Sequence, residues 1–141
     1  MRISPKHVFF ATLLGAAVLT GCNTAQVMEV RNAPYGASSV AAPKRLALDD
    51  YERAIIRAGA ERGWVMQRVA PGHLEASVDV RGKHTAVVDI FFSPDDFSIA
   101  YKDSRNLKYD AADDTIHRNY NSWVSLLEQE IQREVQVARA S

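Results

Sequence analysis

Side chains able to do chemistry gather in the stretch from residue 101 to residue 121. They are hydroxyl, amide and imidazole groups on Tyr101, Ser104, Asn106, Tyr109, His117, Tyr120 and Asn121. His117 and Asn121 are four apart, so on a helix they would share one face. His117 would then be a general base for the Ser104 hydroxyl, as in a small-ligand binder or a hydrolase. No G-x-S-x-G elbow accompanies the pair, so the pattern favours a structural role in capping and loop anchoring. We therefore predict no catalytic residue.

Metal and cofactor ligands are not found at the spacing of a known site. His73, His84 and His117 are spread over the chain with no second ligand at zinc spacing. Residues 103–114 have the length of a calcium loop, but Arg105 stands where an oxygen ligand belongs and the central glycine is missing. There is no glycine-rich phosphate loop. We expect no metal, no cofactor and no enzymatic activity.

One cysteine follows a short basic and then apolar N-terminal segment. The apolar run over residues 8–19 is shorter than the roughly 20 residues of a membrane-spanning helix, and it has the length of a signal-peptide core. Residues 19–22, Leu-Thr-Gly-Cys, resemble the bacterial lipobox. The resemblance implies that residues 1–21 are a removed signal peptide and that Cys22 becomes the lipidated first residue. The alternative is an ordinary secretory signal with an unrelated cysteine.

Lipidation of Cys22 predicts where the protein works. Each buried methylene of an acyl chain contributes about 0.8 kcal/mol. One chain therefore anchors a protein only marginally, whereas two or three chains, of which palmitate would be one, keep it in the membrane. Asn23 follows the cysteine, and by the same resemblance the absence of an aspartate there favours the outer membrane. We expect a lipoprotein of the bacterial envelope that faces the periplasm, with the membrane as its first partner.

The remainder of the chain has the size and charge of one ordinary domain. Removing residues 1–21 from 141 leaves 120 residues with 15 basic and 17 acidic side chains, enough to bury roughly two-thirds of the unfolded surface. A net charge of −2 gives no electrostatic footprint for nucleic acid and no polybasic patch for a membrane. Cys22 is the sole cysteine, so no disulfide is expected. Oligomeric state is not determined by these features.

Residues 22–47 are predicted to be the lipidated cysteine and a flexible tether. They are rich in Ala, Ser, Val and Asn and contain Pro34, Gly36 and Pro43. A flexible coil of about 25 residues spans about 25–30 Å, which would hold the domain off the bilayer. The alternative is that residues 27–30, Val-Met-Glu-Val, add an edge strand to the sheet.

The predicted domain, residues 48–139, begins and ends with a helix. Asp49 and Glu52 have the spacing of a capping box and Gly63 follows at the C′ position, which predicts a helix of about 14 residues between them. A second helix is expected over residues 115–137. Its apolar residues repeat at intervals of three and four and form a single stripe: Ile116, Tyr120, Trp123, Val124, Leu127, Ile131 and Val135.

Strand signals occupy the region between the helices. They cover residues 64–69, 74–80, 85–92 and 97–102, with turn residues between them. Short connections between successive strands predict antiparallel hairpins. The fold class is therefore α+β, in the order α-β-β-β-β-α, with a four-stranded antiparallel sheet and both helices packed on one face.

The face of the sheet away from the helices is a candidate partner surface. It is expected to carry mostly polar residues, but Val87 and Phe91 also lie on it, and Val65 or Val69 would extend an apolar patch. Scattered exposed apolar residues are common, and residues 27–30 would be an alternative cover for this patch.

The chain also resembles a family of small proteobacterial lipoproteins of uncharacterised function. The resemblance covers most of residues 46–135, including Ala54-Ile55-Ile56, Gly63-Trp64, Tyr101-x-x-Ser104-x-Asn106-Leu107 and Ile116-His117-x-x-Tyr120-Asn121-x-Trp123. It implies the lipoprotein assignment and the fold but no catalytic role. We therefore expect a non-enzymatic interaction or structural module with an envelope protein partner; the alternative is the small-ligand binder or hydrolase around Ser104 and His117.

Overall fold

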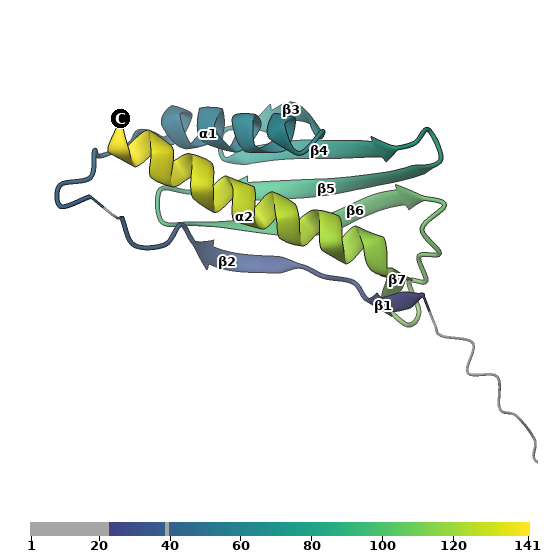
Figure 1. The fold of residues 1–141 in the computed structure, drawn as a ribbon. Coiled ribbons are helices and arrows are strands. Elements are labelled where there is room, and N and C mark those ends of the chain that lie inside the picture. Colours follow the sequence, from purple (N-terminus) through teal and green to yellow (C-terminus); the bar gives the residue numbers. More distant parts are fainter. Residues whose placement is uncertain (1–22, 39) are drawn as a thin grey trace, which may run out of the picture.

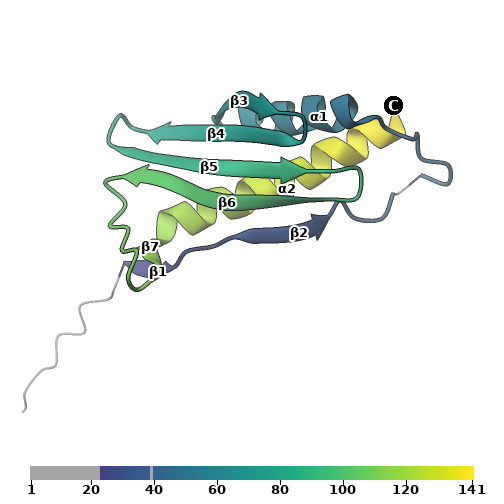
Figure 2. The same cartoon turned by 180° about the vertical axis from the view of Figure 1, so that it is seen from behind.

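The computed structural model describes residues 23–38 and 40–141, and Cys22 with the whole predicted signal peptide lies outside them. The fold is α+β: helices α1 (Leu48–Glu61) and α2 (Arg118–Ala140) lie on the same face of an antiparallel sheet (Figure 1). Seen from behind, the other face is covered by no described element (Figure 2). The strands are β1 (Thr24–Gln26), β2 (Val30–Pro34), β3 (Val65–Ala70), β4 (His73–Val80), β5 (His84–Phe92), β6 (Asp96–Arg105) and β7 (Thr115–His117).

The central hairpins follow the alternation of the sequence. The sheet order is β2-β6-β5-β4-β3, and strands β3 to β6 are joined as successive antiparallel hairpins. Alternate side chains point toward the helices and are buried, among them Ala76, Val88, Ile90 and Ile99. Full burial of an apolar side chain of this size contributes about 1.5–3 kcal/mol. The antiparallel hairpins and the helix-facing residues confirm the sequence prediction.

The sheet has five strands, not the predicted four. The added strand is β2, which pairs with β6 at the edge and lies in the segment predicted to be a flexible tether. Tyr35 follows it and is 1% exposed. Its ring packs against Tyr51 and Phe97 at centroid distances of 4.9 and 5.3 Å. The tether prediction is therefore wrong for residues 24–35, because pairing and burial order this part of the chain. The alternative, an edge strand, is the arrangement observed, but over Val30–Pro34 and not over residues 27–30.

Helix α1 has the predicted length but a different cap. It is 14 residues long, and its N-cap residue is Ala47 rather than the predicted Asp49. The Asp50 carboxylate accepts a hydrogen bond from the Ala47 backbone amide at 2.8 Å, which lowers the pKa of Asp50, and Arg53 pairs with the same carboxylate. At the other end Gly59 allows close approach to β3, since a Cβ there would lie 2.1 Å from Met66 Sδ.

Helix α2 begins three residues later than the predicted 115. Thr115–His117 instead form β7, which pairs antiparallel with β1 in a separate two-stranded sheet. Ile116 is buried as expected, although it belongs to a strand and not to the helical stripe. The rest of the stripe is confirmed, with Trp123 partly buried and the remaining members fully buried: Tyr120, Val124, Leu127, Ile131 and Val135.

Ion pairs join the two helices along their shared seam. Glu130 and Glu134 of α2 are largely buried. Glu130 pairs at 2.9 Å with Arg62, the residue that caps the end of α1, and Glu134 pairs at 3.1 Å with Arg57 of α1. Arg133 binds both carboxylates from within α2. Its hydrogen bond to Glu130 and its charge, and to a lesser extent the charge of Arg62, lower the pKa of Glu130 against the opposing effect of burial. Arginines from both sides of the seam thus stabilise the charged form of the buried Glu130 carboxylate.

Candidate functional site

The predicted polar cluster separates into groups with different partners. Tyr101 is the centre of the first group: its hydroxyl is 2.9 Å from Ser104 Oγ. The Tyr101 ring stacks on Tyr109 at 4.2 Å and meets Tyr120 edge-on at 5.7 Å. Burial raises the pKa of Tyr101 and, more strongly, that of Tyr120. The Tyr120 hydroxyl is buried without a hydrogen-bond partner among the described residues.

Asn106 belongs to a turn. Its backbone has φ +58°, a left-handed conformation that asparagine tolerates. Its side-chain amide donates to the Lys83 carbonyl at 2.7 Å, and the His84 Nδ1–H donates to the Asn106 carbonyl at 2.8 Å. These contacts join the β4–β5 turn to the end of β6.

His117 and Asn121 hold the start of α2 and the N-terminal segment. His117 is the N-cap residue, and its Nδ1 accepts from the Asn119 amide at 3.2 Å. The Asn121 side chain accepts from the Met28 amide at 2.9 Å and donates to the Gln26 carbonyl at 2.8 Å. The Asn121 side chain therefore satisfies two backbone groups where the chain passes from β1 to β2.

The structure does not assemble a Ser–His pair from these residues. In the described part of the chain, Ser104 Oγ is bonded to Tyr101 and the His117 ring to the α2 amide, with no hydrogen bond between them. A general base must lie within hydrogen-bond reach of its nucleophile, directly or through one water. The observed contacts tie strands, turns and a helix cap together.

The open face of the sheet carries Val87 and Phe91 as expected from the alternation. Phe91 is 46% exposed, and its ring stacks on His73 at 4.3 Å. Paired polar side chains lie around it: His73 Nε2 contacts Asp89 Oδ1 at 2.8 Å, and Lys102 Nζ contacts Glu75 at 2.5 Å. Val87 is half-buried. The apolar surface is thus interrupted by polar side chains that already have partners.

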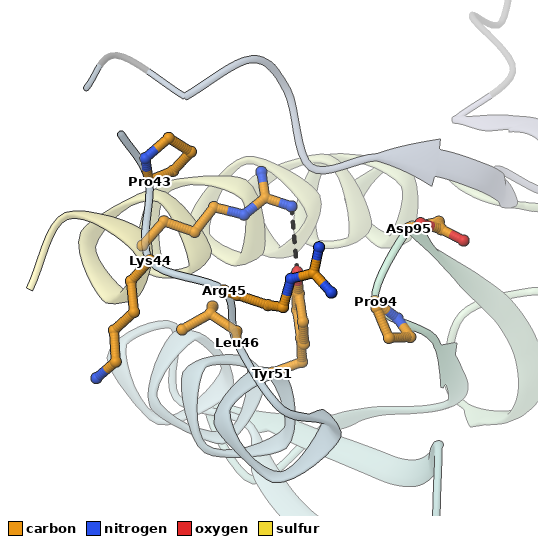
Figure 3. Close-up of a pocket in the computed structure, with 8 residues that line it drawn as sticks. Pro43, Lys44, Arg45, Leu46, Tyr51, Pro94 and Asp95 are labelled. Carbon is orange, nitrogen blue, oxygen red and sulfur yellow. Dashed lines mark hydrogen bonds between the residues drawn. The ribbon is translucent and has the colours of Figure 1, made fainter. Parts of the chain in front are cut away.

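A cavity of about 630 Å³ lies at the end of the molecule opposite β1 and β7. The turn between β5 and β6, the start of α1, the last turn of α2 and the segment before α1 meet there. Figure 3 shows the residues that line it: Pro43, Lys44, Arg45, Leu46, Tyr51, Pro94, Asp95 and Arg139.

Arg139 is held in place on the wall of this cavity. Its guanidinium donates to the Gly36 carbonyl at 3.2 Å and to the Tyr51 hydroxyl at 3.3 Å. It also lies 5.5 Å from the centre of the Tyr35 ring and 5.8 Å from that of Tyr51, within the range of cation–π attraction. Arg45 extends alongside Tyr51, whereas the Lys44 ammonium points away from it (Figure 3).

Sequence reasoning missed this cavity. Lys44 and Arg45 stand in the segment predicted to be a tether, and Arg139 near the end of a helix satisfies the helix dipole without any further role. A pair of adjacent cations next to a proline was the available signal. It carries little weight alone, because charged residues in an exposed segment are common.

Two classes of site are absent from the described residues. No group of three or more His, Cys, Asp or Glu side chains in residues 23–38 and 40–141 is arranged to hold a metal ion. Neither helix in the same part of the chain is long and apolar enough to cross a membrane.

The chain was compared with protein-family models, with curated proteins and with solved structures. None of these three comparisons finds a match.

Proposed function

We propose that this protein is a lipid-anchored lipoprotein of the bacterial envelope that acts as a non-enzymatic binding module on the periplasmic side, at the outer membrane. The supporting observation is that the residues directly after Cys22 are bonded to the folded domain. Asn23 directly follows Cys22, and its carbonyl accepts a hydrogen bond from the Arg118 amide at 2.9 Å. Thr24–Gln26 then pair with β7. A lipid on Cys22 would therefore attach to the folded domain without a long intervening coil.

This arrangement gives the domain a preferred direction relative to the bilayer. The end with β1, β7 and the start of α2 would lie at the membrane. Helix α2 has 23 residues, so at 1.5 Å per residue it spans about 34 Å. Its last turn and the cavity beside Arg139 would project away from the lipid. The open sheet face would run along the membrane normal, where a partner could reach it.

Metabolic labelling tests the anchor. Cells that express the full chain with labelled palmitate should incorporate the label and retain the protein in the membrane fraction. Cys22→Ser should lose the label and move to the soluble fraction, whereas the matched Thr24→Ser variant, which leaves the thiol intact, should behave as the wild type. Label retained on the Cys22→Ser protein would contradict the proposal.

Crosslinking tests the binding role of the open face. Envelope partners captured with the wild-type protein should be lost with Phe91→Asp, which places a charge on that face. Val137→Asp is the matched control, because Val137 is exposed to a similar degree, 48% against 46%, but lies on α2. Equal capture by both variants would exclude the open face as the partner surface.

A further inference from the structure

The cavity near the end of α2 contains cationic groups that the protein itself does not neutralise. Most described arginines have a carboxylate within 4.0 Å, and the exceptions are Arg45, Arg81, Arg118 and Arg139. Two of these, Arg45 and Arg139, line the same cavity. Asp95 also lines it but pairs with neither of them among the described residues. Like charges brought to one site repel unless an anion joins them.

The two guanidinium groups differ in what else they do. Arg139 supports the fold, because it holds Gly36 and Tyr51 and sits at the end of α2, where a cation is favourable. Arg45 has no such role: it is exposed, and its side chain makes no hydrogen bond or ion pair in the described part of the chain. Its position alongside Tyr51 (Figure 3) is therefore not explained by stability.

The geometry suits one planar or tetrahedral anion. A guanidinium presents parallel N–H donors that match carboxylate and phosphate oxygens. Arg139 is already oriented by its two hydrogen bonds and its contacts with two aromatic rings. Less side-chain entropy is then lost on binding, which favours affinity.

The remaining walls suit an apolar body. Pro43, Leu46 and Pro94 line the cavity beside the Tyr51 ring, and a volume of about 630 Å³ is in the range of sites for small organic ligands. An inorganic ion would leave most of this space filled by water. The lining therefore favours an anionic group carried on a compact apolar or aromatic ring.

We propose that this cavity binds a small organic anion, with its phosphate or carboxylate group between Arg45 and Arg139 and its apolar body against Leu46 and Pro94. The proposal goes beyond the membrane anchor, since none of these residues depends on Cys22. The site belongs to the end of the domain opposite β1 and β7.

Isothermal titration calorimetry on the full chain in a neutral detergent tests it. Phenyl phosphate and benzoate are the probes, and the tighter of the two identifies the preferred anionic group. Phenol carries the ring without the charge, and inorganic phosphate carries the charge without the ring; both should bind at least about tenfold more weakly, a difference of about 1.4 kcal/mol.

Substitution of Arg45 locates the site. Arg45→Glu should weaken binding of the better probe at least about tenfold, and Arg45→Lys, which keeps the charge but loses the fork of donors, should have a smaller effect. Arg81→Glu is the matched control: Arg81 is also an exposed arginine without a carboxylate partner in residues 23–38 and 40–141, but it lies in the β4–β5 turn. The Arg81→Glu variant should bind the better probe with the affinity of the wild type. Circular dichroism verifies that each variant is folded.

Other outcomes would overturn the proposal. If Arg45→Glu and Arg81→Glu bind the probes equally, the cavity is not the site. If phenol binds as tightly as phenyl phosphate, the site does not recognise the anionic group. If inorganic phosphate binds as tightly as phenyl phosphate, the site does not recognise the apolar body. Cys22→Ser should bind like the wild type, so a failure of the lipid anchor is separated from a failure of this site.

Discussion

The two ends of α2 differ in how far the polar side chains around them are paired within the protein. At its start, Asn121 and His117 are bonded to backbone groups, and Tyr101 and Ser104 are bonded to each other nearby. At its last turn, Arg139 lines a cavity with Arg45, and neither has a carboxylate partner among the described residues. The sequence drew attention to the first end, which has the residue types of a catalytic site. The structure draws attention to the second.

The difference shows that pairing is more informative than residue type. A buried polar group must be paired to avoid a cost of about 1–3 kcal/mol. Stability therefore sufficiently explains the contacts of Ser104, His117 and Asn121. The buried Tyr120 hydroxyl, by contrast, has no partner among the described residues. Arg45, which lines the cavity without a hydrogen bond or ion pair among the described residues, is not explained in this way. The following predictions use stability to test whether the first end is structural and the second is not.

Asn121→Ala should have the largest effect. It removes hydrogen bonds to Met28 and Gln26 and leaves backbone groups unpaired, so we expect a loss of about 2 kcal/mol in the free energy of unfolding. Urea denaturation measures it. Ser122→Ala, one residue further on the exposed side of α2, should change stability by less than about 0.5 kcal/mol. Equal effects of both variants would contradict a structural role for Asn121.

Ser104→Ala should cost about 1 kcal/mol, because the Tyr101 hydroxyl loses its hydrogen bond in a partly buried site. The double variant with Tyr101→Phe removes both partners together and should cost less than the sum of the single changes. A double-mutant cycle in urea measures the coupling. Strict additivity would show that the contact does not contribute to stability.

The stability that the ion pairs of Glu130 contribute along the seam between the two helices should depend on pH. The pKa of Glu130 is lowered below its ordinary value of 4.5 by the hydrogen bond from Arg133 and by the charge of Arg133, and less by Arg62. The folded state therefore binds fewer protons than the unfolded state near that pH. This contribution is present above the unfolded pKa and is lost as pH falls through the folded pKa. Exposed partners limit it to about 0.2–1 kcal/mol. Urea titrations should show a shallower acid loss for Glu130→Gln than for the wild type; parallel curves would refute the assignment.

Arg45→Ala should have the smallest effect on stability, within about 0.5 kcal/mol of the wild type, since its side chain has no hydrogen bond or ion pair to lose among the described residues. Arg62→Ala is the contrast, because Arg62 pairs with the buried Glu130 at 2.9 Å, and its loss should be measurably destabilising in thermal or urea unfolding. If Arg45→Ala destabilises as much as Arg62→Ala, the cavity end is structural and the comparison between the two ends fails.

The central strands were predictable because their signal is local. In β4 and β5 alternate residues face the helices, so burial on one face leaves a period of two in the sequence itself. The α2 stripe is equally local, since burial of one helical face leaves a period of 3.6.

The ends of the elements were less predictable. Ile116 fits both a helical stripe and a strand, and pairing of β7 with β1 decides between them. The edge strand β2 contains Asn32 with a positive φ and ends at Pro34, so it has no clear strand pattern. It is a strand because β6 offers an unpaired edge. Competition between such alternatives depends on neighbours that are distant in the sequence.

The amino-acid sequence alone determined the α+β class, the hairpins and the apolar faces, because each depends on residues close together in the chain. Lipid attachment at Cys22 rests on an equally local pattern and stays a prediction. Only the tertiary structure decided that Ser104 and His117 have separate partners and that Arg45 and Arg139 share a cavity. Loops and helix ends from distant parts of the chain meet according to how the layers pack. The pairing state of a charge is therefore a property of the folded molecule.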